Sequence, residues 1–339
     1  MALLFVDGFD HYAFADKLTK WTSLVSSNQG SMATGRFGTG QLALVGAGAT
    51  QNCGWIKQNL VGTNATWVVG FAWQATIFGA NTVVRLFDTG GTAHLELRTV
   101  AGGQITVCRN GTVLATSATV FATNTWYYLE LKGLIDDAGS YEFRVDGVTN
   151  LSGSADTRNA GVTNCGGLCI GSTSGGQNHQ RFDDLYLLDG AGSAPNNDFL
   201  GDVRVTAIMP SGDGNSSQWV GSDGNSVNNS LLVDETTPAT ADYVESSVVG
   251  DKDTYAFGDI ASSGTVYGVQ FAPYAAKTDA GSRSIVSVAR LSGTETDGSV
   301  KALSVSPGYL LDIRETKPGG GAWTASDINS AEFGIKVNA

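Results

Sequence analysis

Apolar and polar residues alternate along much of this chain, and this pattern limits its fold more than any other feature. The clearest case is His94-Leu95-Glu96-Leu97-Arg98. A period of two places successive side chains on opposite faces, so each such run predicts a β-strand with one buried face. Related strand-like runs rich in β-branched and aromatic residues cover 66–73, 83–87, 104–109, 112–114, 126–131, 140–145 and 180–189.

Turn signals separate these runs. Asn110-Gly111 and Asp146-Gly147 each stand between two predicted strands, and such pairs favour tight hairpins because both residues tolerate positive φ. The 339 residues include 45 glycines but only 6 prolines, and the glycines follow no fixed period. Because 7 Trp, 10 Tyr and 14 Phe are also present, the composition indicates a packed core and not a disordered chain.

Helix signals are nearly absent. The best candidate covers 326–332, where Thr324 or Ser326 would cap the first turn,. We find no repeat at a fixed period, so a propeller or a solenoid is disfavoured. The sequence therefore predicts an all-β protein.

A small, polar stretch containing one proline marks the predicted domain boundary. We expect a first domain at 1–190, a linker at 191–198 and a C-terminal β domain at 199–339,. Both lengths fall in the usual domain range. The second domain is expected to form another β-sandwich from strands at 203–208, 243–249, 266–271, 284–291, 309–314 and 332–337, after a polar segment at 211–230.

The charge pattern excludes some partners. The formal net charge is −12, from 20 basic and 32 acidic residues. No cluster of Lys and Arg is present of the kind that binds phosphate backbones, so no nucleic-acid partner is expected. No run approaches the roughly 18 apolar residues of a membrane span, and the first ten residues lack a basic segment typical of a secretory signal. We expect neither membrane insertion nor signal-dependent secretion.

Three local patterns resemble a known fold family. They are residues 5–10 with Trp21 nearby, residues 125–131 before a Gly turn, and residues 182–186 in the last predicted strand. On these patterns, residues 1–190 resemble the concanavalin A-like, or laminin-G-like, jelly-roll domains. Segments 199–205 and 323–334 resemble the C-terminal regions of bacteriophage virion proteins that carry such a domain. The resemblance implies an all-β chain, with a concanavalin A-like jelly-roll β-sandwich followed by a second β-sandwich-like domain.

The resemblance also implies a function. It points to a non-enzymatic structural protein on the surface of a bacteriophage virion, as a capsid (head) decoration or fibre, a collar or a tail component. Such a protein would be made in the host cytoplasm and released by lysis. Its partners would be other virion proteins and further copies of itself in an oligomer, together with host-surface glycans. Two alternatives stay open, a carbohydrate-binding lectin-like module and a polysaccharide-cleaving glycoside hydrolase.

The residue patterns argue against an enzyme. Glycoside hydrolases need two carboxylates flanking the scissile bond, and the Glu-x-Asp-x-Glu strand of related β-glucanases is missing, because Glu295-Thr296-Asp297 is followed by Gly298. Glu130 and Glu142 lie on neighbouring predicted strands and are expected to face solvent. None of the three histidines stands beside a nucleophile motif; they are His11, His94 and His179.

Calcium is the best ligand prediction, although no cofactor is required. Calcium prefers several oxygen ligands from carboxylates and carbonyls. Concanavalin-like jelly rolls often hold one structural ion near the first and last strands, which implies Asp7, Asp10, Asp183 and Asp184 as metal ligands. Loops 213–215 and 223–225 are further candidates, and the competing interpretation is that their Asp and Asn residues only make turns.

Trp219 is the best candidate for glycan binding. Sugar sites often use an exposed aromatic ring, and this tryptophan lies inside the polar segment 211–230. Most other tryptophans fall in strand patterns typical of a core. The four cysteines allow three complete disulfide pairings, and free thiols are favoured over a Cys165–Cys169 bridge or a zinc site; they are Cys53, Cys108, Cys165 and Cys169.

Overall fold

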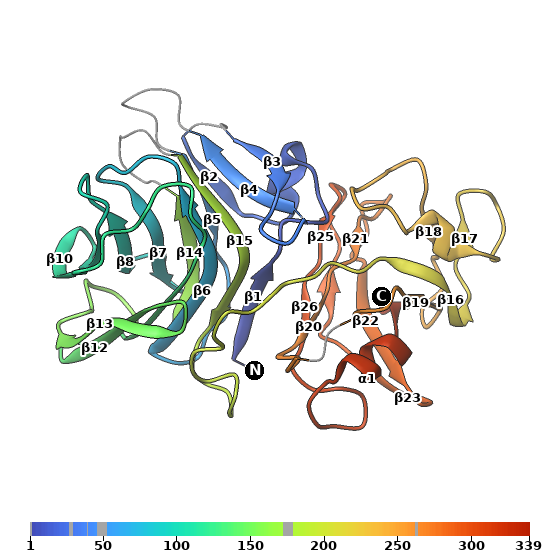
Figure 1. The fold of residues 1–339 in the computed structure, drawn as a ribbon. Helices are drawn as coiled ribbons and strands as arrows, with labels where there is room; N and C mark the ends of the chain where they lie inside the picture. The colour runs from blue at the N-terminus through green and yellow to red at the C-terminus, as the bar shows by residue number, and fades with distance from the viewer. Residues whose placement is uncertain (1, 27–29, 39, 46–52, 172–178, 262–263) are drawn as a thin grey trace. The chain divides into compact units, whose positions relative to one another are not determined.

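The computed structural model describes residues 2–26, 30–38, 40–45, 53–171, 179–261 and 264–339. The chain forms two compact units, Met1–Thr206 and Ala207–Ala339. In both units the regular secondary structure consists almost entirely of antiparallel β-strands (Figure 1). The predicted all-β fold class is therefore confirmed.

Two antiparallel sheets form the first unit. Sheet A has eight strands in the order β13-β12-β11-β6-β15-β4-β3, with β1 paired to β15. Its strands are β1 (Leu3–Asp7), β3 (Ser31–Thr34), β4 (Gly40–Val45), β6 (Thr66–Ala75), β11 (Tyr127–Leu134), β12 (Gly139–Val145), β13 (Val148–Ala155) and β15 (His179–Leu188).

Sheet B has seven strands in the order β10-β9-β8-β7-β14-β5-β2. A short 3-10 helix, η1 (Phe14–Thr19), lies between β1 and β2 in the chain. The strands of sheet B are β2 (Ser23–Ser26), β5 (Cys53–Lys57), β7 (Thr82–Asp88), β8 (Ala93–Thr99), β9 (Ile105–Arg109), β10 (Thr112–Thr116) and β14 (Cys165–Gly171).

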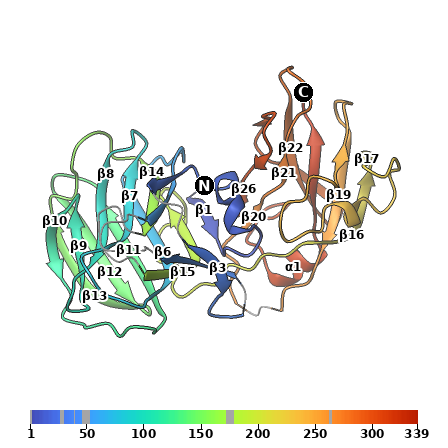
Figure 2. The ribbon, with the colours of Figure 1, turned by 90° about the horizontal axis from the view of Figure 1, so that it is seen from above.

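The two sheets form two layers, which Figure 2 shows from above. On sheet A, Leu131 lies opposite Val69 and Phe143, and on sheet B, Leu97 lies opposite Val84 and Val107. All of these side chains are fully buried. Because cross-strand partners share a face, the apolar side of each strand faces the core, as the alternation predicts.

The two predicted hairpin turns are present. Asn110 and Gly111 have φ values of 41° and 93°, and Asp146 and Gly147 have φ values of 50° and 78°. Two successive residues with positive φ match the twist of the strands that they join.

The first unit extends beyond the predicted linker, to Thr206. The sequence predicts a strand at residues 203–208, but the structure has no strand there. Within this stretch, Val205 N–H donates to a side chain of sheet A, Asp184 Oδ1, at 2.8 Å. An apolar run indicates an extended segment, but it does not show whether its partner is a backbone or a side chain.

The second unit is built on sheet C, which has the order β16-β19-β27-β22-β23 with β24 paired to β22. Three two-stranded sheets accompany it, β17-β18, β20-β26 and β21-β25. Its elements are β16 (Pro210–Ser217), β17 (Val220–Gly221), η2 (Asn229–Leu232), β18 (Val244–Glu245), β19 (Lys252–Phe257), β20 (Val269–Phe271), β21 (Tyr274–Ala275), β22 (Ser284–Leu291), β23 (Thr294–Asp297), β24 (Lys301–Ala302), β25 (Gly308–Tyr309), β26 (Asp312–Arg314), α1 (Ala325–Ser330) and β27 (Glu332–Val337).

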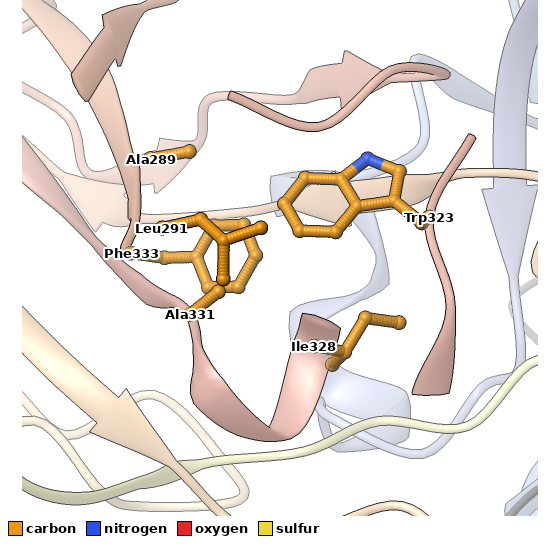
Figure 3. Packing of buried hydrophobic residues seen from close by; sticks show 6 residues of the cluster. All are labelled: Ala289, Leu291, Trp323, Ile328, Ala331 and Phe333. Atoms are coloured by element: carbon orange, nitrogen blue, oxygen red, sulfur yellow. The ribbon is translucent and has the colours of Figure 1, made fainter. Parts of the chain in front are cut away.

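The core of the second unit lies against sheet C and α1. Figure 3 shows Trp323 beside Leu291 and Phe333, with Ile328 of α1 below them. The rings of Trp323 and Phe333 have centroids 5.7 Å apart. Thr324 caps α1, because its side chain accepts from Asp327 N–H while the Asp327 carboxylate accepts from Thr324 N–H. This confirms the predicted helix and one of its two candidate caps.

Candidate functional site

Oxygen atoms gather in the first unit where the chain after β1, the β3–β4 hairpin and β15 meet. A Cβ at Gly35 would come closer than 3.0 Å to both Asp183 Oδ2 and the carbonyl oxygen of Gly40. A Cβ at Gly40 would come equally close to the carbonyl oxygen of Phe9 and to Asp10 Oδ1. Real Cβ atoms essentially never approach other atoms so closely, so oxygens surround two positions that only glycine fills without displacement.

A third glycine borders the same cluster. A Cβ at Gly8 would lie 2.5 Å from the carbonyl oxygen of Val205 and 3.0 Å from Asp10 Oδ2. The two oxygens of Asp183 accept backbone N–H groups, from Arg36 at 3.2 Å and from Asp184 at 2.9 Å. The cluster therefore contains two carboxylates and several carbonyl oxygens, with backbone donors behind the carboxylates.

Ionisation of the buried carboxyl groups in and beside the cluster is unfavourable. Burial raises the pKa of Asp183 to about 8, and the charges of Asp184 and Asp10 add to the effect. Burial also raises the pKa of Asp184 to about 6, although Val205 N–H and Arg36 oppose the shift. A bound cation would favour the ionised form of these carboxyl groups.

These residues fit a calcium ion. Asp10 and Asp183 would supply carboxylate oxygens, and Phe9 and Gly40 would supply carbonyl oxygens, which is the ligand chemistry that calcium prefers. Within the described part of the chain, no three Asp, Glu, His or Cys side chains form a metal-binding group, so the backbone carbonyls would be needed. Asp184 lies beside the cluster, and its Oδ2 is 3.2 Å from Arg36 Nε.

Asp7 does not share this role, although the sequence predicts it as a ligand. Its carboxylate is fully buried and pairs with Lys20 Nζ at 3.1 Å. It also accepts hydrogen bonds from Tyr12 Oη and Trp21 Nε1. Asp7 lies at the end of β1, but this network already engages both of its oxygens. The predicted set of four metal ligands is therefore wrong at Asp7.

Residues 198–205, here named the covering segment, lie over the outer face of sheet A. Gly201 N–H donates to Glu130 Oε1 at 2.8 Å, and Leu200 N–H donates to Tyr186 Oη at 3.2 Å. Tyr186 Oη in turn donates to Glu130 Oε1 at 2.5 Å. Glu130 is fully buried, so the prediction that it faces solvent is wrong, because the covering segment shields it.

Charged contacts hold the covering segment along its length. Lys132 Nζ lies 2.9 Å from Asp198 Oδ1, and the guanidinium of Arg144 lies 4.0 Å from the ring centroid of Phe199. Arg36 pairs with Asp202. The backbone of the segment thus satisfies the buried polar groups of sheet A, while its side chains pair with charges at the rim.

No open pair of catalytic carboxylates results from Glu130 and Glu142. Burial raises the pKa of Glu130 on β11. Glu142 lies on the neighbouring strand, β12, and pairs with Arg144 of the same strand at 2.7 Å. In the register of β11 and β12, Glu130 faces Arg144 and Glu142 faces Lys132. Each acid therefore has a basic neighbour, and one of the two is covered by the chain itself.

Trp219 lies in the core of the second unit. It is 8% exposed and packs with Ile285, Ile335 and Val337, and its Nε1 donates to the carbonyl of Asp251 at 3.1 Å. The ring has no free face for a sugar, so the exposure predicted for this residue is wrong. The polar segment around it forms β16, β17 and η2, and partly buried apolar side chains from later in the chain, among them Val244 and Phe271, pack against the same cluster.

The candidate loops of the second unit make turns. Asp213 accepts the N–H groups of Asn228 and Ser230, and Asp223 accepts both the N–H and the side-chain amide of Asn225. These bonds favour the interpretation that the loops are structural.

Three cysteines are buried free thiols, as predicted; they are Cys108, Cys165 and Cys169. The side chain of Cys53 lies outside the described residues. Among the histidines, His94 has both ring nitrogens engaged. Its Nε2 lies 3.3 Å from Asp88 Oδ2, and its Nδ1 accepts from Asn159 N–H at 3.0 Å. These contacts favour a structural role for His94. No helix in the described part of the chain is long and apolar enough to cross a membrane.

Arg36, Gly35 and Gly40 shape the oxygen cluster and were not predicted from the sequence. A signal was present, because residues 35–40 read Gly-Arg-Phe-Gly-Thr-Gly, a density of glycine that indicates close backbone approach. Lys20 was missed because nothing local shows that a lysine is buried.

Comparisons with known proteins give likenesses among solved structures only. No family model matches the chain, and no curated protein matches it. An endo-β-1,4-glucuronan lyase from the fungus Trichoderma reesei shares 14% identity over 50% of this chain and 92% of its own, with a TM-score of 0.39. A sialidase shares 14% identity over 57% of this chain and 19% of its own, with a TM-score of 0.43. A cellulose-induced protein shares 18% identity over 56% of this chain and 94% of its own, with a TM-score of 0.38.

Proposed function

We propose that this chain is a non-enzymatic structural protein on the surface of a bacteriophage particle. The observation that carries the proposal is the covering segment. It occupies the outer face of sheet A, where Gly201 and Leu200 bond to Glu130 and Tyr186. A face closed by its own chain supports a structural role over a catalytic one, because substrate would have no access to the buried acid.

The resemblance of segments 199–205 and 323–334 to virion proteins supports the same proposal. The chain would act as a head decoration or fibre, a collar or a tail component, and would assemble with copies of itself and with capsid or tail proteins. Sandwiches of antiparallel sheets suit this work because their edges and faces can be shared between subunits.

In this function a calcium ion would stabilise the fold of the first unit. Asp10 and Asp183 would bind the ion together with the carbonyls of Phe9 and Gly40, and the ion would join the chain after β1, the β3–β4 hairpin and β15. It would thereby offset the effects of burial and of the neighbouring charges of Asp184 and Asp10, which raise the pKa of Asp183,.

Co-sedimentation tests the proposal. Lysate from the source culture is separated on a density gradient, and peptides of this chain and of the major capsid protein are quantified in each fraction. The proposal predicts a shared peak at constant stoichiometry, with an abundant host protein as the control that stays at the top. If this chain also stays at the top, the virion proposal fails and carbohydrate binding becomes the next function to test.

A further inference from the structure

A buried lysine and a buried carboxylate meet at the end of β1. Lys20 Nζ lies 3.1 Å from Asp7 Oδ1, and the exposed fractions of the two residues are 2% and 0%. Aromatic rings surround them, since Nζ lies 5.4 Å from the ring centroid of Phe5 and 5.7 Å from that of Tyr12. The amine and the carboxylate are therefore held in contact and away from solvent.

Hydrogen-bond donors converge on the carboxylate. Tyr12 Oη donates to Asp7 Oδ2 at 2.7 Å and Trp21 Nε1 donates to the same oxygen at 2.9 Å. Phe9 N–H donates to Oδ1 at 2.9 Å. Two donors on one oxygen form the arrangement that stabilises negative charge during acyl transfer.

A base also lies beside the lysine. His11 Nε2 is 3.2 Å from Lys20 Nζ. An imidazole nitrogen within hydrogen-bond reach of an amine can accept its proton.

An ion pair in this position is costly. Burial lowers the pKa of Lys20, with the charge of Asp7 opposing the shift. Burial would raise the pKa of Asp7, but the charges of Lys20 and His11 and the donors Tyr12 and Phe9 lower it overall. Taking both charges out of water is offset only in part by their attraction, so a neutral covalent product would remove a penalty that the ion pair keeps.

We propose that Lys20 and Asp7 join through an intramolecular isopeptide bond. The amide nitrogen is Nζ of Lys20, the acyl carbon is Cγ of Asp7, and one water molecule is released. The proposal is independent of the proposed function.

The bond forms without oxidant or reductant. Lys20 transfers one proton to Asp7 Oδ1, which gives a neutral amine and a neutral carboxylic acid. Nζ then attacks Cγ, while Tyr12 and Trp21 hold the negative charge on Oδ2. His11 accepts the second proton from Nζ and passes it to the Oδ1 hydroxyl, which leaves as water when the C–O bond breaks. Holding the two groups in contact supplies an effective concentration of about 10⁵ M or more, which overcomes the excess of water.

Intact-mass measurement of the denatured full chain tests the proposal. The expected mass is that of the sequence less one water. After tryptic digestion, the peptide that ends at Lys17 should be joined to the peptide from Leu18 to Arg36, because an acylated Lys20 is not cleaved. A full sequence mass, with free cleavage at Lys20, would overturn the proposal.

Variants separate the bond from a structural ion pair. Lys20→Arg should show the full mass of its own sequence. Asp7→Asn should release ammonia instead of water and give the same product mass as the wild type, an outcome that an ion pair cannot produce. Lys317→Arg is the matched control, because Lys317 pairs with Asp327 at 2.9 Å in a partly exposed position, and the water deficit should persist in that variant. The bond would also be rejected if trypsin failed to cleave at Lys20 but neither protein had lost mass. The losses that the bond requires are one water in the wild type and one ammonia in Asp7→Asn.

Discussion

Gly201 donates its backbone N–H to Glu130 Oε1 at 2.8 Å, and this bond joins two positions 71 residues apart. It places the chain that leaves the first unit directly over a buried acid of sheet A. The same segment reaches Tyr186 through Leu200 and Asp184 through Val205. The covering segment is therefore part of the first unit and not of the C-terminal domain in which the sequence placed residues 199–205.

Shortening Leu200 should destabilise the first unit. This side chain is 8% exposed, and Leu200→Ala should lower the free energy of unfolding by about 2–3 kcal/mol, through lost burial and the cavity left behind. Calorimetry of the full chain measures the effect. Leu231→Ala, at a leucine that is 65% exposed, should change stability by less than about 0.5 kcal/mol. Equal effects of the two variants would contradict the role given to the covering segment.

The fold was predictable from the sequence where strands alternate cleanly and turns carry Asn-Gly or Asp-Gly. Residues 284–291 and 332–337 were predicted with the bounds of β22 and β27, because apolar runs of that length must be buried on a sheet. The chain divides into two units, and the boundary lies after Thr206, beyond the predicted linker at 191–198. Small polar residues at 191–198 resemble a linker, whereas bonds within residues 199–206 come from side chains distant in sequence. Burial of Trp219 was missed for the same reason, since local polarity does not show what packs over a ring.

The candidate site was predictable only in part. The resemblance to concanavalin-like jelly rolls suggested Asp10 and Asp183 as ligands, and calcium binding by these two residues stays a prediction. The carbonyl oxygens of Phe9 and Gly40 carry no sequence signal, because every residue has one. The partner of Asp7 depends on where Lys20 folds back, and that is set by tertiary packing.

Calcium should stabilise the first unit. An ion that binds only the folded chain adds about 2.7 kcal/mol at a concentration one hundred times its dissociation constant. Calcium should therefore raise the melting temperature of the chain, and a chelator should reverse the change. Titration calorimetry measures binding directly.

Asp183→Asn provides the matched test of that site. It should abolish the stabilisation by calcium while the chain stays folded in its absence. Asp137→Asn, at an exposed carboxylate paired with Arg158, should leave the stabilisation unchanged. Retention of calcium binding by Asp183→Asn would remove this residue from the site.

Without calcium, Asp183 should make stability fall as pH rises. Its pKa is raised from 3.8 to about 8, and that of Asp184 is raised to about 6. A raised carboxyl pKa means that the folded chain binds the proton more tightly, so the contribution is complete below pH 3.8 and is lost as pH rises through these two values,.

The comparison with Asp183→Asn isolates this effect, because asparagine stays neutral. Between about pH 5 and pH 9, wild-type stability should fall relative to the variant by on the order of 2 kcal/mol. Urea unfolding of both proteins at each pH provides the measurement. Parallel pH profiles would show that Asp183 does not titrate in this range.

Removing the Trp219 ring should destabilise the second unit without affecting any glycan interaction. Trp219→Ala should cost about 3–5 kcal/mol, as expected for a large buried aromatic. Tyr243→Ala, at an aromatic side chain that is 45% exposed, serves as the control and should have a small effect. Glycan-array binding that disappears in a folded Trp219→Phe variant would argue against this assignment.

Immunogold electron microscopy of intact, purified particles tests the central claim most directly. An antibody raised against this chain should label the surface of the particle, and the position of the gold would distinguish head, collar and tail. Particles treated with pre-immune serum give the background. Regular labelling above that background is the predicted result. Particles that carry the expected capsid protein but no label would contradict the assignment to the virion surface.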